Sequence, residues 1–352
     1  MKILAAPFAF LFAALAATSV SALEDWDLER WLTPLDYASD TEAIQYARIG
    51  AASRTWRLCV AYPHLKDAYW LSVNYGMVQE AQRLGVSFRL VEAGGYPNLD
   101  RQIQQIRECM REGADALVVG TVSYDGLTET LLDIARENPV IATVNDIASD
   151  GIIAKSGVSW VQMGAAAGRA IADRHPKGSA PVKIAWFPGP KGAGWVTFVQ
   201  QGFEEALAES SAEIVVTKWG DTGREIQVRL VEEALIERPD IDYIVGSAPA
   251  AEAAVSILRA NGLSDKIGIV SDYMTHAVFR GIRRGRILSA PTDFPVLQGK
   301  LAIEQAVRAL EGKLEITHAG PRVVIVDQDN LDEVGSDGSL APPAFQPVFR
   351  LN

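Results

Sequence analysis

Short apolar runs alternate with longer amphipathic stretches along most of the chain. In the first half, the apolar runs predict buried strands and the amphipathic stretches predict helices, which end near glycines such as Gly85 and Gly113. The expected strands are 58–61, 86–91, 116–119 and 140–144, and the expected helices are 69–84, 99–111 and 127–136. Strands and helices of these lengths in alternation are typical of parallel βαβ units.

The alternation breaks at residues 145–159 and then resumes. The second series predicts helices at 161–174, 198–208, 226–237, 250–260 and 275–284, and strands at 182–187, 214–217, 243–245, 267–270 and 287–290. Two similar series joined by an irregular bridge favour an α/β protein with two doubly wound parallel-sheet lobes over one large sheet.

The helix at 297–310 and the strand at 322–326 come too late to extend the second series simply. We expect the helix to return to the first lobe and the strand to cross back, so that several crossings form a multi-strand hinge. The expected first lobe is 56–148 with 292–318, the second is 149–291 with 319–326, and the flanking segments are 23–55 and a tail at 327–352. A ligand would sit between the lobes, where the carboxyl ends of the strands meet.

The first 22 residues have the pattern of a secretory signal peptide. Met1-Lys2 gives a positive start, 3–20 is apolar, and the small residues before Leu23 suit cleavage after Ala22. The alternative is a membrane anchor, but the run spans a bilayer only if its weakly apolar Ala and Thr residues count. We therefore expect a protein of the periplasm.

Composition and charge narrow the function classes. The chain is 48% hydrophobic and 22% charged with a formal net charge of −11, which argues against nucleic acid as a partner. The four histidines lack the spacing of a metal site, and no nucleophile elbow or phosphate loop is present. The Gly-rich stretch 189–194 is better interpreted as a turn. We expect neither an enzyme nor a cofactor.

The two cysteines, Cys59 and Cys109, fall in the first expected strand and the second expected helix. In a doubly wound sheet, the connection from strand two to strand three crosses over strand one, which would lay this helix on that strand. A disulfide is the favoured prediction, and two separate buried thiols are the alternative.

Aromatic residues recur where expected strands end. Trp70 follows the first strand, Tyr96 the second and Tyr273 a strand of the second series, while Trp160 lies at the bridge. Aromatic faces attract onium groups by cation–π interaction, and Tyr and Trp also carry hydrogen-bond donors. Such a set suits a small molecule that is methylated at nitrogen and carries a negative oxygen. Core packing and sugar stacking are the alternatives, although a sugar site usually needs more polar side chains than these loops contain.

Four stretches make the interpretation more specific, namely Leu58–Met77, Glu92–Tyr96, Trp160–Gly164 and Ser271–Met274. Together they resemble the periplasmic sensors of trimethylamine N-oxide within the type I periplasmic-binding-protein family. The resemblance runs in order from about residue 56 to 326. It implies that fold, and it implies that the protein binds trimethylamine N-oxide and signals to the periplasmic domain of a membrane sensor histidine kinase that controls anaerobic respiration genes.

The resemblance also implies site residues. Trp70, Tyr96, Trp160 and Tyr273 would form an aromatic cage, with Tyr69 and Asp67 near the amine-oxide oxygen. Tyr69 can donate a hydrogen bond directly, whereas an ionised Asp67 cannot. Asp67 would orient a water or a hydroxyl, or carry a proton; alternatively it caps the helix that begins near Tyr69.

The resemblance does not extend residue by residue to 23–55, to 191–197 or to the tail. The second functional hypothesis is therefore a solute-binding protein that delivers a sugar or a small amine to an ABC transporter. A cytoplasmic repressor of similar core fold is disfavoured by the signal peptide and by the lack of a DNA-binding segment.

Overall fold

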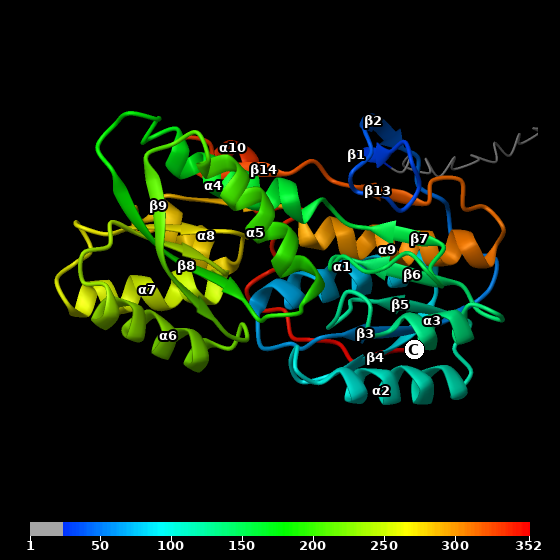
Figure 1. Cartoon of the computed structure of the whole chain (residues 1–352). Coiled ribbons are helices and arrows are strands. Elements are labelled where there is room, and N and C mark those ends of the chain that lie inside the picture. The colour runs from blue at the N-terminus through cyan, green and yellow to red at the C-terminus, as the bar shows by residue number, and fades with distance from the viewer. Residues whose placement is uncertain (1–23) are drawn as a thin grey trace, which may run out of the picture.

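The computed structural model describes residues 24–352, which form two α/β lobes side by side (Figure 1). The expected signal peptide, residues 1–22, lies outside the described residues. Within residues 24–352, no helix combines the length and apolarity that a membrane crossing requires.

The first lobe is built on a nine-stranded sheet. In spatial order its strands are β15 (Arg350–Leu351), β4 (Ser87–Glu92), β3 (Arg57–Tyr62), β5 (Ala116–Val119), β6 (Val140–Thr143), β7 (Ala154–Ser156), β13 (His318–Gly320), β1 (Trp26–Trp31) and β2 (Thr41–Tyr46). The strands from β4 to β13 are parallel, and antiparallel β15 and the β1–β2 hairpin flank them.

Helices cover both faces of the central strands of this sheet. They are α1 (Ala68–Leu84), α2 (Leu99–Arg111), α3 (Thr128–Ile134) and α9 (Pro295–Leu310). Alternate residues of β3 enter different clusters, since Leu58 packs with residues of α1 whereas Cys59 packs with residues of α2 and α3. The backbones of helices α1 and α9 approach so closely that only glycine fits at position 76. A Cβ at Gly76 would lie 1.9 Å from the carbonyl oxygen of Val296.

The second lobe has a six-stranded sheet. Its strands in spatial order are β14 (Val324–Asp327), β12 (Ser289–Thr292), β11 (Gly268–Ser271), β10 (Tyr243–Gly246), β8 (Val182–Gly189) and β9 (Ala212–Trp219). Its helices are α4 (Trp160–Ala172), α5 (Gly194–Leu207), α6 (Arg224–Glu237), α7 (Ala248–Ala260) and α8 (His276–Arg283), and a short α10 (Leu331–Val334) follows β14. All strands except the edge strand β14 run parallel.

The lobe boundaries differ from the expected ones. The chain crosses to the second lobe after Ser156 rather than at 149, because β7 still pairs with β6. The third crossing comes after Gly320 rather than at 319, because β13 pairs with β7 and β1 in the first sheet. The flanking segments are not separate either: 23–55 contributes β1 and β2, and the tail returns to the first lobe as β15. The expected return of α9 to the first lobe is what the structure has.

Cys59 on β3 and Cys109 on α2 form a disulfide, with their Cα atoms 5.9 Å apart. The bond ties α2 to the sheet and closes a loop with a sequence separation of 50. In the chain-entropy model such a loop stabilises the folded lobe by about 4 kcal/mol.

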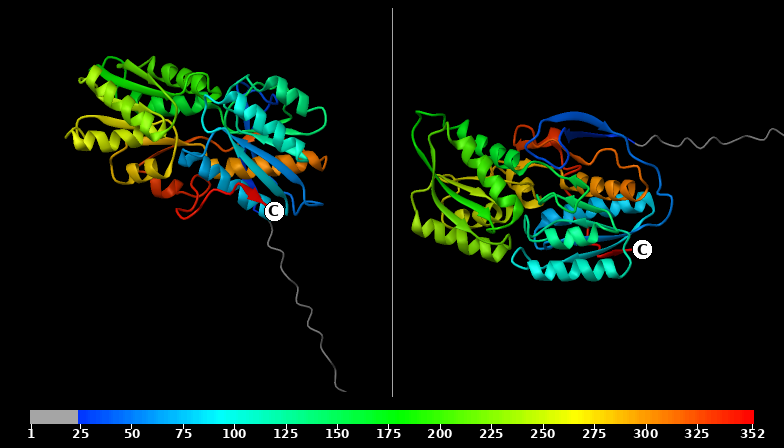
Figure 2. Two further views of the ribbon diagram at one scale, coloured as in Figure 1. Left: turned by 90° about the horizontal axis from the view of Figure 1, so that it is seen from below. Right: turned by 45° about the vertical axis from the view of Figure 1, so that its right-hand side comes forward.

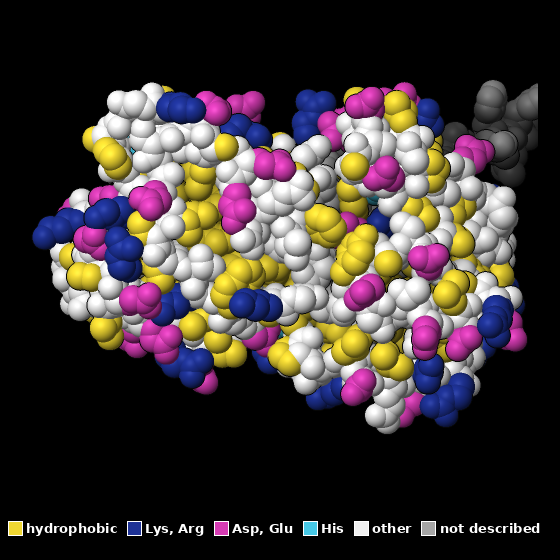
Figure 3. Space-filling view, viewed as in Figure 1, with side chains coloured by type: hydrophobic (Ala, Val, Ile, Leu, Met, Phe, Trp, Pro, Cys, Tyr) yellow, Lys and Arg dark blue, Asp and Glu magenta, His cyan; other side chains and the backbone are white. Residues whose placement is uncertain are grey.

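The two lobes are in contact in this structure. Figure 2 shows them side by side from two further directions, and Figure 3 shows hydrophobic side chains on the surface of both lobes near their junction. A Cβ at Gly194 of α5 would lie 2.3 Å from the carbonyl oxygen of Asp146 in the first lobe. The ring of Tyr124 also meets that of Phe198, with centroids 5.6 Å apart. The arrangement is therefore a closed one.

Candidate ligand-binding site

A cavity lies between the lobes, where the carboxyl ends of both sheets meet. It is a small cavity. We call it the interlobe cavity, and its lining residues are Asp67, Tyr69, Trp70, Tyr96, Asn145, Trp160, Trp195, Thr222 and Tyr273. The structure thus brings together all six residues that the sequence singled out for ligand binding.

The first-lobe wall is positioned by the start of α1. Asp67 is the N-cap of this helix, and its Oδ1 accepts a hydrogen bond from the backbone N–H of Tyr69 at 2.9 Å. The cap fixes Tyr69 and Trp70 in the first turn, where both are buried. Their rings meet edge to face with centroids 5.9 Å apart. The capping interpretation of Asp67 is confirmed for one of its two oxygens.

The second oxygen of Asp67 faces the other lobe. The hydroxyl of Tyr273 donates a hydrogen bond to Oδ2, which links the two lobes across the cavity. Burial raises the pKa of Asp67 to about 7, against the opposing effect of the Tyr273 hydrogen bond. A carboxyl with this pKa carries a proton in a large fraction of molecules near neutral pH, and a protonated carboxyl is a donor.

Tyr69 has a different role from the one expected. Its hydroxyl donates to Oδ2 of Asp293 at 2.5 Å, and Gln298 donates to the same oxygen at 2.6 Å. Asp293 follows β12 at the return crossing, so Tyr69 connects the cavity with the hinge. In this arrangement the hydroxyl hydrogen of Tyr69 is used in the hydrogen bond to Asp293, so Tyr69 cannot donate a hydrogen bond to a ligand.

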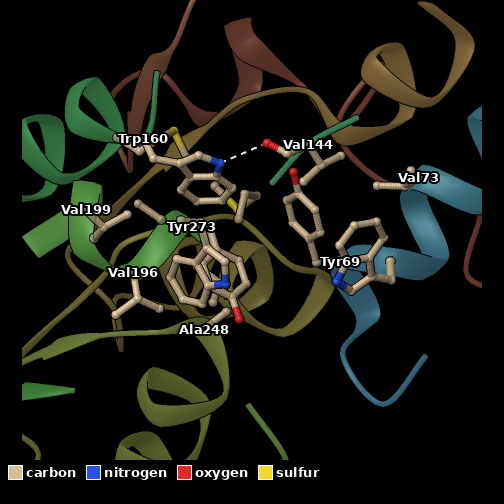
Figure 4. Close-up of a cluster of buried hydrophobic side chains, with 14 of the residues drawn as sticks. Tyr69, Val73, Val144, Trp160, Val196, Val199, Ala248 and Tyr273 are labelled. Atoms are coloured by element: carbon tan, nitrogen blue, oxygen red, sulfur yellow. Dashed lines mark hydrogen bonds between the residues drawn. The ribbon is translucent and has the colours of Figure 1, made fainter. Parts of the chain in front are cut away.

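The second-lobe wall begins with Trp160, the first residue of α4. Its indole N–H donates to the carbonyl oxygen of Val144 in the first lobe at 2.9 Å. Figure 4 shows this bond, with Trp160, Tyr69 and Tyr273 in one buried cluster. The ring of Trp160 lies 5.3 Å from that of Trp195, centroid to centroid.

Sequence reasoning missed three lining residues, and Trp195 is the most informative. It is 2% exposed, and its ring centroid lies 6.0 Å from that of Tyr273 and 6.3 Å from that of Tyr96. Its indole Nε1 is buried without a hydrogen-bond partner among residues 24–352. The strand-end rule could have found it, because β8 ends at Gly189 and α5 begins at Gly194, not at 198 as expected.

The other two missed residues are polar. Asn145 follows β6 and donates to the hydroxyl of Tyr96 at 3.2 Å and to the carbonyl oxygen of Thr121 at 2.7 Å. Thr222 belongs to the second lobe, and its hydroxyl lies 3.0 Å from Nε2 of His64 in the first. Burial lowers the pKa of His64 to about 4, so its ring is neutral at physiological pH.

Within the described residues, no group of three or more His, Cys, Asp and Glu side chains could hold a metal ion. The interlobe cavity instead combines six aromatic rings with one titratable carboxyl, that of Asp67. Such a lining can take a compact organic cation or zwitterion, because aromatic faces stabilise an onium group away from water.

Comparisons with known proteins identify the family to which this two-lobed chain belongs. Residues 55–329 match the family of periplasmic binding proteins and sugar binding domain of LacI family. The chain belongs to this family. It is 40% identical over 301 residues to the periplasmic protein TorT of Escherichia coli K12, covering 85% of each chain.

Solved structures agree with that assignment. A complex of the TorS sensor domain with TorT, determined in the presence of TMAO, matches with a TM-score of 0.77 and 42% identity, covering 84% of this chain and 99% of that one. An ABC transporter solute-binding protein from Bradyrhizobium sp. BTAi1 with bound Bis-Tris matches with a TM-score of 0.80 and 44% identity, covering 94% of this chain and 100% of that one.

Proposed function

We propose that this chain is a periplasmic sensor protein, which binds trimethylamine N-oxide in the interlobe cavity and reports it to a membrane histidine kinase related to TorS. The observation that carries the proposal is the aromatic lining of a small closed cavity whose edge holds a carboxyl with a raised pKa. The 40% identity to TorT over 85% of the chain supports the choice of ligand and partner.

The ligand has three methyl groups on a positive nitrogen and one negative oxygen. The rings of Trp70, Tyr96, Trp160, Trp195 and Tyr273 offer apolar contact to the methyl groups and their electron-rich faces to the nitrogen. The donors left for the oxygen include protonated Asp67 and the indole N–H of Trp195. The oxygen would satisfy a buried N–H that is otherwise left without a partner.

A transporter role with another small amine is the second candidate. It is favoured by the 44% identity to the Bradyrhizobium solute-binding protein with bound Bis-Tris. A sugar fits less well, because most side-chain donors of the cavity are already committed. Trp160 donates to Val144, Tyr69 to Asp293, and Asn145 to Thr121 and Tyr96. Several sugar hydroxyls would therefore lack partners.

Signalling would follow from lobe closure. Asp67 with Tyr273, and His64 with Thr222, join the lobes at the cavity. A ligand held by both walls favours the closed arrangement, and a kinase domain that prefers this arrangement shifts with it. By linkage, the kinase domain would raise ligand affinity by the same factor by which ligand raises kinase affinity.

The test is calorimetric titration of the mature protein with trimethylamine N-oxide, with and without the kinase sensor domain. We expect saturable binding that Trp160→Ala lowers by at least about 100-fold, since the ring contributes both cation–π attraction and apolar contact. Trp219→Ala is the matched control, because Trp219 lies on β9 outside the cavity. Saturable heat with Bis-Tris but none with trimethylamine N-oxide in either titration would favour the transporter role.

A further inference from the structure

A second hollow lies on the second lobe, away from the interlobe cavity. It runs between the start of α6 and the helices α7 and α8. Its open space is about 990 Å³. Five arginines line it, and we call it the arginine groove: Arg224, Arg259, Arg280, Arg284 and Arg286.

The charge of the arginine groove is poorly compensated. All five arginines are exposed, and none forms an ion pair within residues 24–352. The one acidic lining residue is Glu252, whose carboxylate accepts a hydrogen bond from the hydroxyl of Thr275 at 2.8 Å. Burial raises the pKa of Glu252, while the nearby charges of Arg280 and Arg224 act in the opposite direction.

This positive surface stands on a chain of net charge −11. Most other arginines of the second lobe form ion pairs with acidic side chains. Arg229 pairs with Glu233, Arg238 with Asp240 and Arg283 with Asp332. Like charges that share a groove repel one another, and an acidic partner relieves that repulsion. The guanidinium fork is also the side chain best matched to carboxylates, which it binds through two parallel hydrogen bonds.

We propose that the arginine groove is a docking site for an acidic segment of a partner protein. A hollow that draws arginines from three helices and a turn is wider than a single small anion requires. Its concave shape also suits a chain segment better than a flat anionic bilayer. Opposite charges would steer the partner to this face and make the association sensitive to salt.

The arginine groove is connected to the interlobe cavity through one turn. Tyr273 lines the cavity, and Thr275, two residues later, is the N-cap of α8 and the donor to Glu252 in the groove. Helix α8 then carries Arg280 into the groove. If the partner is the kinase sensor domain, this connection rests on the proposed function; the docking of an acidic segment does not.

The experiment uses a labelled oligoglutamate peptide as the probe, with fluorescence anisotropy at low salt. The variant is Arg259→Gln with Arg280→Gln and Arg284→Gln, and the control is Arg111→Gln with Arg136→Gln and Lys177→Gln, three exposed basic residues elsewhere that carry the same change of charge. We expect the groove variant to weaken peptide binding about tenfold and to flatten its salt dependence, and the control to bind like the unmodified protein. Equal losses in both variants would overturn the docking site, since only net charge would then matter.

Two further measurements separate the alternatives. Vesicles that contain phosphatidylglycerol should bind the unmodified protein and the groove variant equally. If the vesicles bind only the unmodified protein and the peptide binds neither, the proposal is overturned in favour of a membrane contact. Titration with trimethylamine N-oxide should give the same heat in both variants, which shows that the fold and the cavity are intact. Absence of that heat in the unmodified protein contradicts the proposed function and leaves the peptide result to decide the docking site.

Discussion

The two walls of the interlobe cavity hold their polar groups in different ways. On the first-lobe wall, Asp67 caps α1 and Tyr96 accepts from Asn145 within the same lobe, while Tyr69 is bound to Asp293 at the hinge. On the second-lobe wall, the bonds run across the gap. Trp160 donates to Val144, and Tyr273 donates to Asp67, both in the first lobe.

This difference indicates that the first wall is preformed and that the second is completed only when the lobes close. A wall that depends on closure couples ligand binding to lobe arrangement, because its contacts are lost together when the lobes separate. Trp195 is the exception on the second wall, since its N–H has no partner within residues 24–352 and is left for the ligand.

Among the residues compared by their hydrogen bonds, the largest expected effect is at Asp67, which belongs to both sides of this comparison. Asp67→Ala removes the α1 cap and the acceptor of Tyr273, so affinity for trimethylamine N-oxide should fall about 100-fold, and the free energy of unfolding should fall by about 1 kcal/mol. Calorimetry and chemical denaturation measure the two losses. Asp67→Asn keeps a capping oxygen and should restore the stability; a lower stability in both variants would contradict the capping role.

Trp195→Phe sharpens the comparison by removing the one uncommitted donor of the second wall while keeping an aromatic ring. We expect about a tenfold loss of affinity for trimethylamine N-oxide with little change in melting temperature, because a hydrogen bond to a charged oxygen is lost. Trp219→Phe serves as control. Unchanged affinity in Trp195→Phe would show that the ligand oxygen does not face this N–H.

The raised pKa of Asp67 predicts a pH dependence with a defined sign. A negative ligand oxygen needs the protonated carboxyl, so affinity should fall about fivefold as pH rises from about 7 to about 8. The folded state also holds this proton more tightly than the unfolded chain, so stability should decrease as pH rises from about 4 through about 7. In Asp67→Asn the affinity should not vary over this range. A simple cation as ligand would give the opposite trend, which titration at several pH values distinguishes.

Tyr273→Phe should give the smallest effect. It removes one bond between the walls and leaves the aromatic face, so the closed arrangement loses part of its advantage over the open one. We expect about a threefold loss of affinity, and small-angle scattering of the ligand-free protein should show a larger radius of gyration. Tyr69→Phe is the contrasting variant, because its partner Asp293 is at the hinge, and the radius should stay unchanged.

Elements with a clear hydrophobic period or a continuous apolar run could be predicted from the sequence, whereas the shortest strands could not. The expected helix at 99–111 coincides with α2, and the expected strand at 116–119 coincides with β5. Strands β7 and β13 have three residues each, which is too few to show a period. They are strands only because they pair with each other and with neighbours that lie far away in the chain.

For the candidate site as well, local features could be predicted from the sequence and contacts between distant residues could not. Sequence by itself determined the α/β class, the two series of elements, and the aromatic residues after the strands, because periodicity and strand-end position are local properties. Only the tertiary structure decided that Tyr69 is committed to Asp293, that Asp67 serves both as cap and as acceptor across the lobes, and that Trp195 completes the cavity. Hydrogen-bond partners and burial depend on which distant segments meet, and the closure of two lobes brings together residues that no local pattern relates.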